Sequence, residues 1–333
     1  MKKVLITGIS GYIAHHCAVE LLKKGYAVRG SVRDLSKIHD ITKSIEKVTD
    51  SNDNLEYCEL NLMKDEGWEK AMNGIDYLLH IASPYVVKEP KNESELIQPA
   101  VEGTQRALKA AKKAGVKRIV LTSSIVAMLH NTDGAVALNQ NSWTNVNNKK
   151  ISAYIKSKTL AEQSAWDFIN NQENGNTLEM VVINPGAVYG PSLSGKLSGE
   201  SMRMFKDLIT GKMPMLPKGA INMSDVRDIA KIHVLALEND KAIGNRFIVS
   251  TKNAHTFQEI ALILKANGYP KVSTKLAPSF LLKFMANFNS DLKGMLPFIG
   301  NTFNGDISNT MKTFNWKPID FKKTVLDTAK SVK

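Results

Sequence analysis

Tyr154 and Lys158 lie four residues apart in the stretch AYIKSKTLAEQSAWDF, which covers residues 153–168. On a helix this spacing places both side chains on one face, one turn apart. A phenol can donate a proton, and a nearby ammonium lowers the phenol pKa from about 10 towards neutrality because it favours the phenolate. The spacing is common by chance, so its meaning depends on its surroundings. Lys156, two positions from either residue, is expected to point to solvent.

Two serines precede this helix. The apolar run RIVLT (118–122) is a strand candidate, so Ser123 and Ser124 are expected at the carboxyl edge of a sheet, where open α/β folds bind ligands. A serine hydroxyl there can hydrogen-bond a carbonyl oxygen and orient it. Carbonyl reduction uses all of these groups, because hydride must reach the carbon and a proton must reach the oxygen.

A glycine-rich turn near the N-terminus indicates where a dinucleotide would bind. TGISGYIA (7–14) follows the apolar run KVLIT and opens a helical pattern. Gly8 and Gly11 allow the tight turn and let the backbone approach a pyrophosphate at the helix N-terminus, while Ala14 permits close helix–sheet packing. The strand before and the helix after are the context that this motif requires.

The segment after the second strand candidate favours NADP(H) over NAD. NAD sites place an acidic residue about 20 residues past the glycines, and here Ser31 and Val32 stand in that zone, followed by Arg33. A guanidinium suits a 2′-phosphate, and Lys37 is close enough in sequence to assist. Asp34 leaves an alternative open, because it can turn inward to the ribose.

The elements that would position these residues alternate between strands and helices. Strands are predicted over 3–7, 27–33, 55–60, 76–82, 118–123 and 180–184, with helices over 14–25, 100–115 and around Tyr154. Continuous apolar runs are typical of parallel strands that are buried on both faces. The pattern predicts an α/β fold of the Rossmann type, a doubly wound parallel sheet with helices on both faces.

The second half of the chain is predicted to add a smaller, mostly helical substrate lobe. Residues 184–201 are rich in Gly, Pro and Ser and indicate a loop. A helix follows over 224–238 with Ser224 as its N-cap, then a strand over 246–250. We expect residues 1–185 plus about 224–250 to form the dinucleotide-binding domain, and about 186–223 plus 251–333 the substrate-binding lobe, with 280–288 as a lid or core helix.

Composition narrows the function classes. The formal net charge of the 333 residues is +12, but basic and acidic residues are interspersed and aromatics make up only 7 %. This pattern argues against nucleic-acid binding and suits an anionic cofactor. Two cysteines without a CxxC motif and no apolar run of about 18 residues predict a cytoplasmic protein without a membrane partner. No metal is expected, since His15 and His16 point about 100° apart on a helix.

Several motifs in order give the chain a family resemblance. They are TGISGYIA, VRGSVRD (28–34), HIASP (80–84), AVEGT (100–104), VLTSS (120–124), YIKSK (154–158), INPGAVYGP (183–191) and DVRDIAKIHVLALE (225–238). Through them the chain resembles the extended short-chain dehydrogenase/reductases. It is most similar to the group with dihydroflavonol 4-reductase, cinnamoyl-CoA reductase and yeast methylglyoxal/isovaleraldehyde reductase.

The resemblance implies a role for each matching residue. Tyr154 would be the general acid, Lys158 would bind the nicotinamide ribose and depress the tyrosine pKa, and Ser124, rather than Ser123, would hold the substrate oxygen. The cofactor would contact Gly8, Gly11, Tyr12, Ile13, Arg33, Lys37, Ala82, Ser83, Thr122 and the loop from Pro185 to Val188, besides Tyr154 and Lys158. At the adenine pocket the family often has Asp-Leu, and here Asn61 and Leu62 replace it, with the amide carbonyl as acceptor.

The predicted function is NADPH-dependent reduction of a small-molecule ketone or aldehyde to an alcohol. Alternatives within enzymes are a 3β-hydroxysteroid-type dehydrogenase and a nucleotide-sugar epimerase or dehydratase, although Arg33 argues against the sugar-nucleotide enzymes. A non-enzymatic NADP-binding regulator on the same fold is the remaining alternative, and the Ser124–Tyr154–Lys158 set argues against it. A monomer and a homodimer are both compatible with the sequence.

Overall fold

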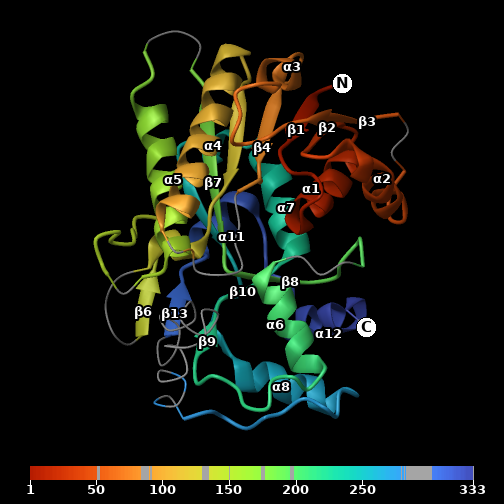
Figure 1. Cartoon of the computed structure of the whole chain (residues 1–333), viewed down its shortest axis with the longest axis vertical. Coiled ribbons are helices and arrows are strands. Elements are labelled where there is room, and N and C mark those ends of the chain that lie inside the picture. The colour runs from red at the N-terminus through yellow and green to blue at the C-terminus, as the bar shows by residue number, and fades with distance from the viewer. Residues whose placement is uncertain are drawn as a thin grey trace.

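A seven-stranded parallel sheet forms the centre of the protein (Figure 1). The computed structural model describes residues 1–50, 53–83, 90, 92–129, 135–149, 151–173, 177–195, 199–278, 280, 282 and 302–332. The strand order is β11-β7-β5-β4-β1-β2-β3. The strands are β1 (Lys3–Ile6), β2 (Ala27–Val32), β3 (Leu55–Glu59), β4 (Tyr77–His80), β5 (Arg118–Thr122), β7 (Glu179–Pro185) and β11 (Arg246–Val249). The predicted Rossmann-type fold class is confirmed.

Helices cover both faces of this sheet. One face carries α1 (Tyr12–Lys23), α2 (Ile38–Glu46) and α7 (Val226–Ala236), and the other carries α3 (Trp68–Met72), α4 (Ser94–Lys113) and α5 (Ala153–Asn170). Because side chains alternate along a strand, Val4 and Ile6 pack with the first set of helices and Leu5 packs with the second. All three residues are fully buried, which explains why β1 is a continuous apolar run in the sequence.

A smaller lobe lies below the sheet in Figure 1. Its core joins α6 (Glu200–Ile209), α8 (Phe257–Ala266) and α12 (Phe321–Ser331). Short strand pairs accompany these helices: β8 (Ala187–Tyr189) with β10 (Met223–Asp225), β9 (Ala220–Ile221) with β12 (His255–Thr256), and β6 (Ala135–Leu138) with β13 (Thr302–Gly305). The remaining elements are α11 (Ser308–Phe314) and the 3₁₀ helices η1 (Leu35–Lys37), η2 (Ile125–Met128) and η3 (Asp240–Ala242).

Some local predictions are wrong. The segment 184–201, predicted as a loop, contains β8, because β10 supplies a pairing partner that local composition does not reveal. Ser224 does not cap α7. Its hydroxyl donates to the carbonyl of Val249, and Asp225 caps the helix by accepting from the Arg227 amide. The region after residue 251 includes β12 and β13, and most of the proposed helix 280–288 lies outside the described residues.

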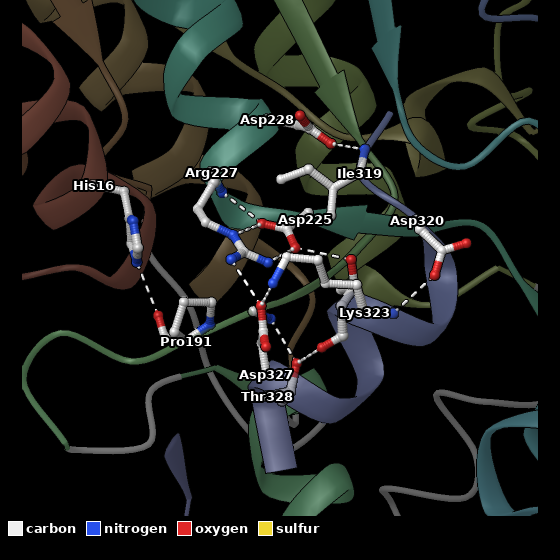
Figure 2. A network of polar contacts seen from close by, with 12 residues as sticks. His16, Pro191, Asp225, Arg227, Asp228, Ile319, Asp320, Lys323, Asp327 and Thr328 are labelled. Atoms are coloured by element: carbon white, nitrogen blue, oxygen red, sulfur yellow. Dashed lines mark hydrogen bonds and ion pairs between the residues drawn. The ribbon is translucent and has the colours of Figure 1, made fainter. Parts of the chain in front are cut away.

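A polar network fixes α12 to α7 (Figure 2). The Arg227 guanidinium bridges Asp225 and Asp327 at 2.7 and 2.8 Å, and the Thr324 hydroxyl donates to Asp225 at 2.8 Å. Thr328, also on α12, accepts the Gly190 amide at 2.8 Å. The C-terminal helix therefore supports the loop that follows β8.

Across the part of the chain that the structure describes, no helix combines the length and the apolar character needed to cross a membrane.

Candidate active site

The glycine turn lies where the strand order of the sheet reverses. β1 is flanked by β2 on one side and β4 on the other, and in doubly wound folds this switch point is where ligands bind. Gly8 has φ +66°, and a Cβ on it would lie 2.9 Å from the Cβ of Ala82 in the loop after β4. The Gly11 amide donates to the Gly8 carbonyl at 2.9 Å. Only glycine leaves the turn open, so these residues fit a bound dinucleotide.

The end of β2 presents two cations beside this turn. Arg33 and Lys37 are exposed, and neither forms an ion pair with any other described residue. Asp34 is turned to its own loop, where it accepts from the amide and the hydroxyl of Ser36 at 3.0 and 2.6 Å. These hydrogen bonds lower the pKa of Asp34. The arrangement favours a 2′-phosphate at the cations over a ribose hydroxyl at Asp34.

Tyr12 and Ile13 open α1 directly after the glycines. Ile13 packs on the core, and the Tyr12 hydroxyl donates to the Gly190 carbonyl at 2.7 Å. His16 reaches the carbonyl of Pro191 at 2.9 Å (Figure 2). The polar end of Tyr12 therefore holds the loop after β8 against α1, so only the rest of the side chain is available to a cofactor.

The predicted adenine pocket lies at the end of β3. The side-chain oxygen Oδ1 of Asn61 accepts a hydrogen bond from the Met63 backbone amide at 3.0 Å. This bond closes a short turn and leaves one lone pair of Oδ1 for a ligand. A Cβ on Gly103 would lie 3.1 Å from the Cβ of Leu62. Gly103 thus allows α4 to pass close behind Leu62, which gives the AVEGT motif a packing role that sequence reasoning did not assign.

Ser124 and Tyr154 meet at the carboxyl edge of the sheet. β5 ends at Thr122, and Ser124 caps η2 by accepting the Val126 amide at 3.4 Å. Ser152 caps α5 by accepting the Ile155 amide at 3.3 Å, so Tyr154 lies in the first turn of that helix. The Ser124 hydroxyl is close enough to the phenol of Tyr154 to lower the pKa of that phenol.

Burial dominates the protonation of this site. The pKa of Tyr154 is raised by desolvation, and the neighbouring Ser124 hydroxyl opposes this shift. The depression of the Tyr154 pKa by Lys158, which the family resemblance implies, stays a prediction for the reacting state. Burial also lowers the pKa of the half-buried Lys158 to about 8, against the opposing effect of the Glu162 charge.

His80 and Thr7 shape the loop that carries Ala82. The Thr7 hydroxyl oxygen accepts the amides of Ile81 and Ala82, both at 3.0 Å, so its proton is directed to Nδ1 of His80 at 3.0 Å. His80 is 1 % exposed, and burial lowers its pKa to about 3. The prediction that His80 is a hydrogen-bonded core histidine is confirmed, and Thr7 is a positioning residue that sequence reasoning missed.

The residues predicted around the nicotinamide half have mixed orientations. The Thr122 hydroxyl is hydrogen-bonded to Nε2 of the buried His233 at 2.7 Å, so this side chain is committed to α7 rather than to a ligand. The Pro185 carbonyl lies 3.5 Å from the Ser124 hydroxyl. Val188 on β8 packs against the core, and Ser83 is half-buried after β4.

The helix α5 presents its other polar residues to neighbouring elements. Lys156 pairs with Glu93 at 2.6 Å and its side chain is 18 % exposed, so the prediction that it points to solvent is wrong. The packing of α4 against α5 supplies this partner, which the sequence does not reveal. The Ser123 hydroxyl donates a hydrogen bond to Glu162 at 2.5 Å. It is therefore directed to Glu162 and not to Tyr154.

The chain belongs to the 3-beta hydroxysteroid dehydrogenase/isomerase family, whose model matches residues 5–277. The predicted membership of the extended short-chain dehydrogenase/reductases is thereby confirmed.

Among its relatives is cinnamoyl-CoA reductase CAD2 of Medicago truncatula, 33 % identical over 280 residues, which cover 79 % of each chain. Another is the NADPH-dependent methylglyoxal reductase GRE2 of Saccharomyces cerevisiae, 29 % identical over 99 % of this chain and 97 % of that protein. The crystal structure of yeast methylglyoxal/isovaleraldehyde reductase Gre2 complexed with NADPH is also similar, with TM-score 0.79 and 26 % identity over 99 % of this chain and 98 % of that one.

Proposed function

We propose that this protein is an NADPH-dependent reductase that converts ketones or aldehydes to alcohols. The observation that carries the proposal is the juxtaposition of Ser124 and Tyr154, with Lys158 one turn further along α5, at the sheet edge beside the glycine turn. The relatives support it, because two of those named above are reductases, one of them NADPH-dependent by name.

The cofactor proposal rests on the fit of the turn and on the cations. Gly8 and Gly11 would receive the pyrophosphate at the N-terminus of α1, with Ala82 alongside. Arg33 and Lys37 would hold the 2′-phosphate, because a guanidinium gives bidentate hydrogen bonds to phosphate. When bound, the cofactor supplies the hydride that reaches the carbonyl carbon.

The chain supplies the remaining chemistry at the carbonyl oxygen. The Ser124 hydroxyl orients this oxygen by a hydrogen bond, which strengthens as negative charge develops on it. Tyr154 donates its phenolic proton to the same oxygen and completes the alcohol. The resulting phenolate is stabilised by the Lys158 ammonium, because opposite charges favour the ionised form. This effect of Lys158 belongs to the reacting state, whereas before the reaction burial keeps the phenol protonated.

We propose that separate parts of the chain bind the cofactor and the substrate. Residues 1–185 plus about 224–250 would bind the cofactor, and about 186–223 plus 251–333 would bind substrate. All residues of the proposed site belong to one chain, so the proposal needs no partner subunit. A cytoplasmic location is part of the proposal and is supported by Cys17 and Cys58, both of which are free thiols.

Oxidation of NADPH with a panel of carbonyl compounds tests the proposal. The panel contains small diketones, branched aldehydes, aromatic ketones, a 3-ketosteroid and a nucleotide sugar. We expect turnover with one or more of the simple ketones or aldehydes. Turnover of the 3-ketosteroid alone would assign a 3β-hydroxysteroid-type dehydrogenase instead. NADPH binding without turnover of any compound would support a nucleotide-binding regulator and overturn the enzyme proposal.

A further inference from the structure

Glu162 is a buried carboxylate behind the proposed active site. It lies on α5 one turn beyond Lys158 and is 1 % exposed. Residues four apart on a helix share a face, so its charge is directed to the same side as the Lys158 ammonium. Burying a carboxylate is costly unless charges and hydrogen bonds compensate for the lost water.

Four donors compensate for this burial. Oε2 of Glu162 accepts from the Ser123 hydroxyl at 2.5 Å and from the Asn184 amide at 2.9 Å. Oε1 accepts from Nε of Arg246 at 2.5 Å and from the Trp166 indole at 3.3 Å. The carboxylate is therefore held from β5, β7, β11 and its own helix at once.

Two of these donors are directly connected to Ser124. Ser123 precedes it in the chain, and the Asn184 amide also donates to the Ser124 carbonyl at 3.2 Å. Pro185, which follows Asn184, has its carbonyl 3.5 Å from the Ser124 hydroxyl. The ends of β5 and β7 that carry the reactive serine are thus anchored on Glu162.

Arg246 balances the charge of Glu162 from the opposite side. It is 6 % exposed, and besides Glu162 it donates to the carbonyls of Ser142 and Gln140 at 2.6 and 3.1 Å. Its guanidinium lies 3.7 Å from the ring centroid of Trp143. Because the guanidinium is fixed by these contacts, the carboxylate has a constant ionic partner.

Within the described part of the chain, the groups that face Lys158 leave Glu162 as its counter-charge. Tyr154 and Glu162 share its helix, and His80 approaches from β4. His80 is neutral near pH 7, because burial lowers its pKa to about 3. Tyr154 is neutral as well, since burial raises its pKa. The Glu162 carboxylate is the anion that opposes the desolvation of the Lys158 ammonium.

We propose that Glu162 is a positioning residue of the reductase, which anchors the Ser124 end of β5 through Ser123 and Asn184 and keeps Lys158 protonated. The proposal rests on the proposed function, because it assigns Lys158 and Ser124 their tasks in carbonyl reduction. Glu162 is hydrogen-bonded to Ser123 and Asn184, not to the Ser124 hydroxyl, and acts on the reacting groups through these neighbours and through Lys158.

Competitive labelling of the free protein with acetic anhydride across a pH range tests the charge effect. Mass spectrometry of the peptide with Lys158 gives the protonation midpoint of this amine without cofactor or turnover, so the result is independent of the proposed function. Glu162→Gln removes the charge at nearly constant shape. Ser123→Ala is the matched control, since it removes one hydrogen bond to Glu162 and keeps the charge. The alkaline limb of the kcat profile with NADPH provides the catalytic comparison.

We expect Glu162→Gln to lower the Lys158 midpoint by roughly one pH unit or more and to move the alkaline limb of kcat in the same direction. Ser123→Ala should reduce kcat and leave the midpoint at its wild-type value. A folded Glu162→Gln protein with an unchanged midpoint would overturn the proposal, and so would an equal shift in Ser123→Ala.

If circular dichroism shows that Glu162→Gln does not fold, the double variant Glu162→Gln/Arg246→Gln decides the question. It removes both charges together, which proteins tolerate better than one unpaired buried charge. The Lys158 midpoint should again be lower than in wild type, because Glu162 is the charge that acts on this ammonium. An unchanged midpoint in the double variant overturns the proposal.

Discussion

The hydroxyl of Ser124, just after β5, is close enough to the phenol of Tyr154, in the first turn of α5, to lower the pKa of that phenol. The neighbouring hydroxyl of Ser123 is instead bound to Glu162 at 2.5 Å. The two adjacent serines therefore have separate roles. Ser124 faces the phenol of Tyr154, and Ser123 faces the buried carboxylate of Glu162. Four predictions test the site and the fold that positions it.

Arg33→Ala should raise the KM for NADPH roughly tenfold or more, because a charge-assisted hydrogen bond to the 2′-phosphate contributes about 1.5–3 kcal/mol. The KM for NADH should change much less, since NADH lacks that phosphate. Steady-state kinetics with both cofactors give the comparison. Asp34→Asn is the matched control, because this side chain is already bound to Ser36. Equal changes of the two KM values in Arg33→Ala would assign cofactor selectivity to another residue.

Acidification should destabilise the fold through its buried histidines. Burial lowers the pKa of His80 to about 3 and that of His233 to about 4, whereas a histidine in the unfolded chain titrates near 6.5. The unfolded state therefore binds more protons below pH 6.5, and the free energy of unfolding falls as the pH drops towards these values. Each histidine contributes a slope of up to about 1.4 kcal/mol per pH unit.

Urea denaturation of wild type between pH 7 and pH 5 measures this slope. His233→Gln should reduce the slope by the share of one histidine, while His39→Gln, at an exposed position of α2, should leave it as in wild type. Identical slopes in His233→Gln and wild type would show that His233 does not govern the acid sensitivity.

Asp225→Ala should lower the free energy of unfolding by about 3 kcal/mol or more, because it leaves the charge of Arg227 without its buried partner. The Asp225 side chain is 1 % exposed, caps α7 and accepts from Thr324 of α12 (Figure 2). Asp320→Ala is the comparison, since this cap of α12 accepts only the Lys323 amide at an exposed position and should cost about 1 kcal/mol. Equal losses in chemical denaturation would refute a special role for the Asp225 network.

Local patterns predicted the parts of the fold that depend on neighbours in sequence. The turn between β1 and α1 follows from Gly8 and Gly11, and the helix with Tyr154 and Lys158 follows from its spacing. The parallel sheet was predictable from the continuous apolar runs, since a strand that is apolar on both sides can pack against helices on both faces of the sheet. These features need no knowledge of distant partners.

Features that depend on residues far apart in the chain could not be predicted from local sequence patterns. Glu162 and Arg246 are separated by 84 positions, so no local pattern pairs them. Lys156 finds Glu93 only because α4 packs on α5, and β8 exists because β10 lies beside it. The effect of burial on the Tyr154 pKa also depends on the whole fold. A carboxylate four residues after the lysine was the available signal for Glu162.

The most direct test of the proposed chemistry compares wild type with Tyr154→Phe in NADPH oxidation with the best carbonyl substrate of the panel. NADPH affinity is measured alongside by calorimetry. Tyr57→Phe is the matched control. Tyr57 lies on the edge strand β3, and its hydroxyl is hydrogen-bonded to the Thr42 hydroxyl at 2.7 Å. Loss of the proton donor should reduce kcat by about 10²–10⁴-fold, with NADPH affinity retained and Tyr57→Phe fully active. Equal turnover by Tyr154→Phe and wild type would contradict the assignment of Tyr154 as the general acid.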